Sequence, residues 1–130
     1  MTKVFTNGCF DIIHRGHIEL LKYCHELGDK VIVAINSDES VKKLKGEKRP
    51  INSQEDRKLI LESFKFVDEV IVFNEDTPYN VITKIQPDII VKGGDYKIEE
   101  VVGNDICKVR IFDYVEGYST TKKIKDIIDR

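Results

Sequence analysis

Two histidines and an aspartate stand close together near the start of the chain. Asp11, His14 and His17 fall within seven residues, and Gly8 and Gly16 allow a tight backbone beside them. Imidazoles next to the first turn of a helix can donate hydrogen bonds to phosphate oxygens, since free N–H groups and the helix dipole favour an anion there. The spacing favours phosphate chemistry. A metal site with Asp11 as third ligand and a plain polar surface both stay open.

A second candidate anion site lies near the C-terminus. Ser119, Thr120 and Thr121 precede Lys122 and Lys123. Hydroxyl and N–H groups at a helix start can hold phosphate oxygens, but the same residues can simply cap a helix. Taken alone, this segment favours the simple cap.

A basic stretch separates two predicted helices. Such runs are mostly solvated surface, although a basic loop beside a phosphate site can also close over it. Lys45 and Arg49 are the candidates here, because Gly46 and Pro50 restrict the backbone next to them. Arg57, early in the next helix, either orients this segment or forms an ion pair with an acidic neighbour such as Asp56.

A glycine pair follows a strongly apolar run in the segment Lys92-Gly93-Gly94-Asp95-Tyr96. The glycines indicate a tight turn or a close approach of a ligand to the backbone. Lys92 can meet a phosphate, and Asp95 can accept hydrogen bonds from a base or a sugar.

Composition narrows the class of protein. The chain has 130 residues, of which 41% are hydrophobic, so we expect one domain spanning residues 1–130. The net charge of -2 predicts no broad attraction to nucleic acid or to anionic membranes. No apolar stretch is long enough for a membrane span or a signal peptide, and the three cysteines have no metal-ligand spacing. We therefore expect free thiols and a cytoplasmic protein.

Short apolar runs alternate with longer segments of helical periodicity, and this pattern predicts the elements that position these residues. Gly28 is expected to stop the first helix, and Ser53 with Asp56 resembles a capping box. Thr77 and Pro78 are expected as N-cap and first helical residue. The expected strands are 4–6, 30–35, 69–73, 88–91 and 107–112, and the expected helices 16–27, 38–44, 53–66, 79–85 and 120–128.

This order predicts an α/β fold: a single-domain, doubly wound, Rossmann-like parallel sheet of about five strands. Ligands of such sheets bind beyond the carboxyl ends of the strands, and the unusual residues follow strands here.

The segment Gly8-Cys9-Phe10-Asp11-x-x-His14-x-Gly16-His17 resembles the Gly-x-Phe-Asp-x-x-His-x-Gly-His signature of the cytidylyltransferase-like nucleotidyltransferase superfamily. The resemblance implies that both histidines contact the phosphates of a nucleoside triphosphate. It places Asp11 at the phosphate and Mg²⁺ end of the site, and it implies that the Ser119 segment binds the β- and γ-phosphates. It also implies that Arg57 orients its segment near the site.

The chain as a whole is most similar to the D-glycero-β-D-manno-heptose 1-phosphate adenylyltransferases. The similarity covers Asn36-Ser37-Asp38, Arg49-Pro50-Ile51-Asn52, Glu75-Asp76-Thr77-Pro78, the Lys92 turn and Gly117-Tyr118-Ser119-Thr120-Thr121. Bacterial glycerol-3-phosphate cytidylyltransferases share the histidine motif but typically carry Arg where Tyr114 stands. Two departures leave the substrate open: residues 101–108 form a shorter region than in the heptose enzymes, and the 130 residues hold no fused sugar kinase, so we expect a separate kinase.

The resulting hypothesis is transfer of a nucleoside monophosphate from a triphosphate, with ATP favoured, to a phosphorylated small molecule, with Mg²⁺ as cofactor. A CTP-dependent cytidylyltransferase, a non-catalytic nucleotide-binding module and a metal-dependent hydrolase are the alternatives. A homodimer is expected because relatives are commonly dimers. The expected catalytic residues are His14, His17 and Lys45; the nucleotide-binding residues are Gly8, Cys9, Phe10, Asp11, Gly16, Lys92, Gly94, Asp95, Ser119, Thr120 and Thr121; and the acceptor-binding residues are Asn36, Asp38, Arg49, Arg57 and Tyr96.

Overall fold

A single sheet of five parallel strands organises the computed structural model, which describes residues 1–94, 96–113 and 119–129. The strand order is β3-β2-β1-β4-β5, and every neighbouring pair is parallel. The α/β parallel fold expected from the sequence is thereby confirmed. The strands are β1 (Lys3–Gly8), β2 (Lys30–Asn36), β3 (Glu69–Phe73), β4 (Ile89–Gly93) and β5 (Lys108–Phe112).

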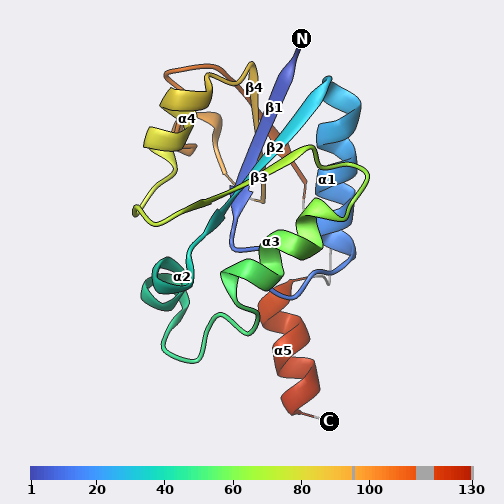
Figure 1. Cartoon of the computed structure of the whole chain (residues 1–130), viewed down its shortest axis with the longest axis vertical. Coiled ribbons are helices and arrows are strands. Elements are labelled where there is room, and N and C mark those ends of the chain that lie inside the picture. The colour runs from blue at the N-terminus through green and yellow to red at the C-terminus, as the bar shows by residue number, and fades with distance from the viewer. Residues whose placement is uncertain (95, 114–118, 130) are drawn as a thin grey trace.

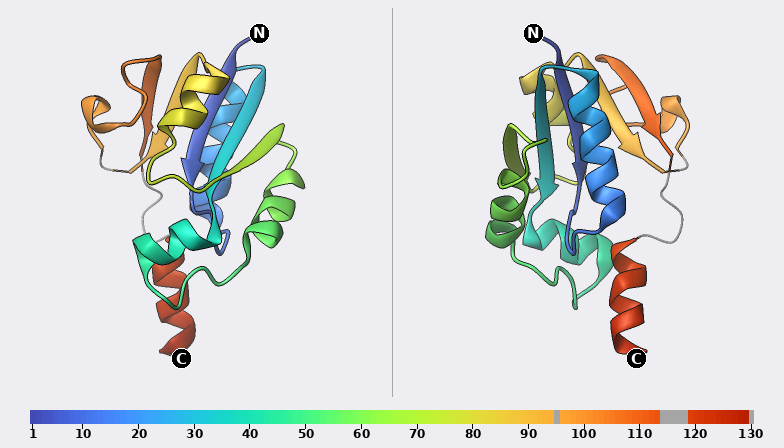
Figure 2. Two further views of the ribbon diagram at one scale, coloured as in Figure 1. Left: turned by 60° about the vertical axis from the view of Figure 1, so that its left-hand side comes forward. Right: turned by 90° about the vertical axis from the view of Figure 1, so that its right-hand side faces the viewer.

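Helices cover both faces of this sheet (Figures 1 and 2). On one face, Leu21 and Cys24 of α1 and Leu61 of α3 join the buried core. On the other face, Ile82 of α4 and Val101, which follows the short 3₁₀ helix η1, close a second core. The helices are α1 (Arg15–Leu27), α2 (Asp38–Lys45), α3 (Gln54–Glu62), α4 (Tyr79–Ile85), η1 (Ile98–Glu100) and α5 (Thr120–Ile128).

Strand β2 shows why the sheet is covered on both sides. Its residues from Val31 to Asn36 are all buried. Val33 faces the α1 and α3 core, whereas Ile32 and Ala34 face the α4 core. A strand buried on both faces needs a continuous apolar run, and the sequence has one there.

The first helix ends at Leu27 with Gly28 as its C-cap, as expected, but Gly28 is extended (φ -161°) rather than left-handed. A Cβ there would lie 2.8 Å from the Thr2 carbonyl oxygen, so close packing requires this glycine. Two other details of the expected helix ends are wrong. Helix α4 begins at Tyr79, but its N-cap is Pro78 and not Thr77, which was expected in that position. Helix α3 ends at Glu62, four residues before Phe66.

The order in which the strands are added to the sheet reverses after β3, because the next strand, β4, pairs with the free side of β1. Strands β2 and β3 extend to one side of β1, whereas β4 and β5 lie on the other. The crevice beyond the carboxyl ends of β1 and β4 is the topological switch point at which such sheets bind ligands. Helix α5 projects from this end of the molecule (Figure 1). None of the helices in the described ranges is long and apolar enough to cross a membrane.

Candidate active site

The loop after β1 is held in a strained conformation. Phe10 is buried and has a positive φ of 48°, which a non-glycine residue adopts only at a cost of roughly 1–2 kcal/mol. A Cβ on Gly8 would lie 3.2 Å from the Phe10 ring, so a glycine lets the ring fold back against the strand. The ring centroid of Phe10 lies 5.1 Å from that of His17. Backbone strain of this kind clusters at functional sites, and here the strained backbone places the Phe10 ring against the ring of His17.

The two histidines cap the helix that carries them. His14 is the N-cap of α1, and its Nδ1 accepts a hydrogen bond from the Gly16 N–H at 3.0 Å. The Nδ1 of His17 accepts from the His14 N–H at 3.2 Å. The ring centroids lie 3.9 Å apart. An acceptor nitrogen carries no proton, so a neutral ring in this arrangement has its proton on Nε2.

Both histidines are held in the neutral form. Burial lowers the pKa of His14, and the positive charge of Lys123 lowers it further. Burial, followed by the neighbouring His14, lowers the pKa of His17 to about 4. At neutral pH, each ring therefore carries a single proton, on Nε2, and no full charge.

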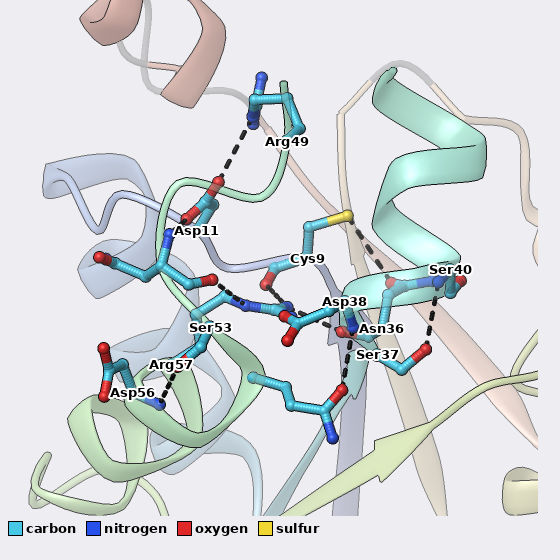
Figure 3. Close-up of polar contacts among 12 residues, drawn as sticks. Cys9, Asp11, Asn36, Ser37, Asp38, Ser40, Arg49, Ser53, Asp56 and Arg57 are labelled. Carbon is cyan, nitrogen blue, oxygen red and sulfur yellow. Dashed lines mark hydrogen bonds and ion pairs between the residues drawn. The ribbon is translucent and has the colours of Figure 1, made fainter. Parts of the chain in front are cut away.

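Asp11 holds the loop that leads from α2 to α3. Its side chain is fully buried and accepts hydrogen bonds from the N–H groups of Ile51 at 2.7 Å and Asn52 at 2.9 Å. The Arg49 Nε completes the set at 3.4 Å from the carboxylate (Figure 3). These three donors occupy both carboxylate oxygens. The arrangement fits a positioning role better than the Mg²⁺ contact expected from the sequence.

Arg57 ties three segments together from inside the protein. Its guanidinium is fully buried and donates to the carbonyl oxygens of Cys9, Asn36 and Asn52 at 2.9, 2.7 and 3.0 Å. It also pairs with the Asp38 carboxylate at 2.9 Å (Figure 3). The sequence suggested Asp56 as an alternative partner. The structure instead gives Arg57 a long-range role that orients the loops after β1 and β2.

The start of α5 reaches the histidine loop. Ser119 is the N-cap, and its hydroxyl accepts from the Lys122 N–H at 3.0 Å. The Thr120 hydroxyl donates to the Ile12 carbonyl oxygen at 3.1 Å, a contact between residues 108 positions apart. The segment is therefore both a helix cap and a neighbour of the histidines.

A first cavity of about 300 Å³ lies where these parts meet. It gathers the loop after β1, the start of α1, the end of β4 and the start of α5, and its size is at the lower end of the range for small-ligand sites. The lining residues are Asn7, Gly8, Cys9, Phe10, Asp11, His14, Gly16, His17, Leu20, Lys45, Arg49, Lys92, Gly93, Tyr96, Phe112, Asp113, Ser119, Thr120 and Thr121.

A second cavity of about 470 Å³ adjoins the first beyond the carboxyl ends of β2 and β3. The two share Asn7, Gly8, Cys9, Lys45, Lys92 and Tyr96 as lining residues. The remaining walls are Asn36, Leu44, Phe73, Asp76, Thr77, Pro78, Glu100, Val101 and Val102.

The structure brings most of the expected residues together. Fourteen of them line the first cavity, and Asn36 lines the second. Arg57 and Asp38 line neither cavity and instead form an ion pair. Gly94 is buried with φ 111°, which gives it a turn role, and Asp95 lies outside the described residues.

The cavity walls also include residues whose site role the sequence did not predict, among them Leu20, Phe112, Asp76, Thr77 and Glu100. Asp76 and Thr77 follow β3, and their place after the carboxyl end of a strand is the one sequence feature that could have indicated a site role. Leu20 and Phe112 are apolar, and no sequence pattern separates such residues from the core.

This arrangement defines a doubly wound α/β domain with a ligand-sized cavity at its topological switch point. Residues 5–126 match the family model described as cytidylyltransferase-like, and the chain belongs to that family.

Curated relatives and solved structures agree with this family. The chain is 62% identical over 127 residues to Bifunctional protein HldE of Campylobacter concisus, covering 97% of this chain and 27% of that protein. It is 61% identical over 119 residues to Bifunctional protein HldE of Nitratiruptor sp., covering 91% and 26%. The chain thus spans about a quarter of the length of these relatives. A lipopolysaccharide core biosynthesis protein from Thermoplasma volcanium superimposes with a TM-score of 0.74 at 29% identity, covering 92% of this chain and 99% of that one.

Proposed function

We propose that the chain transfers the adenylyl group of ATP to a sugar phosphate such as heptose 1-phosphate and releases pyrophosphate. The observation that carries the proposal is the shared wall of the two cavities. One cavity holds the histidine donors and the start of α5, and the adjoining cavity opens from the same wall. Two substrates that must exchange a phosphoryl-type group need two sites that meet.

The first cavity supplies the groups that an in-line transfer needs. A phosphate oxygen of the acceptor attacks the α-phosphorus, a new P–O bond forms, and the bond to the β-phosphate oxygen breaks. The Nε2–H groups of His14 and His17 donate to the oxygens on which negative charge grows. Lys45, Ser119 and Thr120 hold the leaving pyrophosphate. Positioning and charge stabilisation suffice, so no covalent enzyme intermediate is required.

Nucleotidyltransferases of this family generally require a divalent metal ion, and we propose that this chain uses Mg²⁺. Among the described residues, no group of three or more His, Cys, Asp or Glu side chains is arranged to hold a metal ion. Mg²⁺ commonly binds through substrate phosphates and water with few protein ligands, so we expect it to enter with the nucleotide. Asp11 is not assigned as its ligand, because its oxygens already accept three protein hydrogen bonds.

The second cavity is the proposed acceptor site. Asn36, Asp76, Thr77 and Glu100 bring amide, hydroxyl and carboxylate groups to its wall. Such groups suit the many hydroxyls of a sugar, while an acceptor phosphate can approach the cations of the shared wall. Glycerol 3-phosphate is smaller and has fewer hydroxyls to satisfy.

A pyrophosphate-release matrix tests the proposal. ATP, CTP, GTP and UTP are each combined with heptose 1-phosphate, glycerol 3-phosphate and other sugar phosphates. We expect turnover with ATP and heptose 1-phosphate. Turnover only with CTP and glycerol 3-phosphate would instead establish the cytidylyltransferase, which the cytidylyltransferase-like family match keeps as the second candidate. Binding of nucleotide without turnover would favour a non-catalytic module.

We place this reaction in the cytoplasm, with no nucleic acid or membrane partner and with a homodimer as the assembly. The free state of Cys9, Cys24 and Cys107 supports a reducing compartment. Exposed Ile127 and Ile128 on α5 support a contact with a second copy. Light scattering coupled to size-exclusion chromatography distinguishes a dimer from a monomer.

A further inference from the structure

Lys92 occupies the boundary between the two cavities. It lies on β4, next to the glycine at the carboxyl end of that strand, and lines both spaces. The two histidines line only the first cavity, and Asp76 and Thr77 line only the second. Lys45 is the other cation on the shared wall, but its side chain is exposed, whereas Lys92 is half-buried.

The Lys92 ammonium has unusual surroundings for a half-buried cation. Its Nζ lies 5.1 Å from the centroid of the Tyr96 ring. None of the ion pairs found between residues of the described ranges includes it. Burial lowers the pKa of Lys92. The neighbouring Cys9 opposes this shift, and the smaller effect of the Lys45 charge lowers the pKa again. A desolvated cation facing a second cation is costly unless an anion joins them.

We infer that Lys92 binds the phosphate of the acceptor where the two cavities meet and holds it against the α-phosphate of the nucleotide. This inference rests on the proposed nucleotidyl transfer and adds a named contact for the attacking group. The phosphate oxygen that attacks the α-phosphorus must enter the first cavity while the sugar stays in the second. Lys92 is the half-buried cation that touches both spaces, and its anchor on a strand fixes its position.

The contact makes different demands on the two substrates. Removing the charge leaves the histidines and the α5 start in place for the triphosphate. The acceptor phosphate loses a charge-assisted hydrogen bond, which is worth about 1.5–3 kcal/mol and corresponds to a roughly ten- to hundredfold change. Lys92→Met should therefore raise the acceptor KM at least tenfold and lower kcat. The affinity for α,β-methylene ATP should change far less.

The variant series separates this role from a structural one. Lys92→Met keeps the length of the side chain, and Lys92→Arg keeps the charge and should recover much of the acceptor KM. Lys84→Met on α4 is the matched control, because Lys84 is exposed and lines neither cavity. Thermal melts should show that Lys92→Met is folded, since Lys92 forms no ion pair within the described ranges and a methionine of similar length can fill its place.

Two measurements decide the matter. Pyrophosphate release is recorded over a series of heptose 1-phosphate concentrations at saturating ATP. Calorimetry measures the binding of heptose 1-phosphate to protein saturated with α,β-methylene ATP, and it needs no turnover. The inference is overturned if folded Lys92→Met keeps the wild-type acceptor KM and acceptor affinity, or if only its nucleotide affinity falls. Wild-type protein that binds the sugar phosphate in a Lys92-dependent way but releases no pyrophosphate refutes the proposed transfer and leaves the phosphate contact standing.

Discussion

At the scale of single residues, one nitrogen of each histidine caps the helix, and we propose the other nitrogen as the phosphate donor. The Nδ1 atoms of His14 and His17 accept backbone N–H groups, so the proton of each neutral ring lies on Nε2. The sequence predicted the phosphate role from spacing near a helix start. It did not predict the capping role, because ring orientation depends on local backbone angles such as the extended His14 N-cap and the left-handed Phe10.

Substitutions at His17 can separate these tasks. An Asn side chain can replace Nδ1 as the acceptor but cannot reach the position of Nε2. We expect His17→Asn to melt near the wild-type temperature while kcat falls roughly 10²–10³-fold, the usual loss for one transition-state donor. His17→Gln keeps a donor near Nε2 and should retain more activity at the expense of the cap. Pyrophosphate release and thermal melts measure both effects, and a fully active His17→Asn would remove His17 from catalysis.

The lowered pKa of His17 also predicts how stability depends on pH. The unfolded chain binds a proton at His17 below its ordinary pKa of about 6.5, whereas the folded protein resists protonation down to about 4. Stability should therefore fall as the pH drops through this window, by on the order of 2 kcal/mol between pH 7 and pH 4.5 from this residue. Urea unfolding should show a shallower pH slope for His17→Asn than for wild type. His25→Asn, on the same helix but exposed, should keep the wild-type slope.

At the scale of elements, the segment between α2 and α3 is positioned by residues distant in sequence. Asp11 binds the N–H groups of Ile51 and Asn52, and Arg57 binds carbonyl oxygens in three segments. The sequence predicted the helices on either side and placed Asp11 near Mg²⁺. The loop partner could not be predicted, because a separation of 40 residues is bridged only once the sheet has formed.

Asp11→Asn tests whether this carboxylate holds the loop or the metal. The amide keeps one acceptor oxygen, so one loop contact and the charge opposite Arg49 are lost. We expect unfolding free energy to drop by about 1–3 kcal/mol and the nucleotide KM to rise, while the half-saturating Mg²⁺ concentration stays unchanged. Glu47→Gln, exposed on the same loop, is the control. A large increase in the Mg²⁺ requirement with unaltered stability would restore Asp11 as a metal contact.

At the scale of the whole molecule, strand order decides which motifs meet. The sequence predicted five parallel strands and placed the motifs after them. It could not show that β4 pairs with β1 on the side opposite β2. A sheet in which β4 continued beyond β3 would bury the same apolar runs, so the apolar pattern does not distinguish the two strand orders. That pairing brings Lys92 beside the loop of His14 and His17.

Charge distribution gives a further prediction at this scale. The net charge is -2, yet three cations, Lys45, Arg49 and Lys92, face only the two carboxylates of Asp11 and Asp113 in the first cavity, so both proposed anionic substrates should be drawn to a locally positive wall. Added salt shortens the Debye length from about 10 Å at 0.1 M and screens this field most where it reaches solvent. We expect the KM of both substrates to rise between 50 mM and 500 mM NaCl, conditions under which screening increases steeply, while kcat changes less because bound substrates exclude ions. Steady-state kinetics in NaCl and in an isosmotic sucrose control measure the effect. An acceptor KM that ignores salt would show that sugar contacts in the second cavity, rather than the cations of the shared wall, dominate its binding.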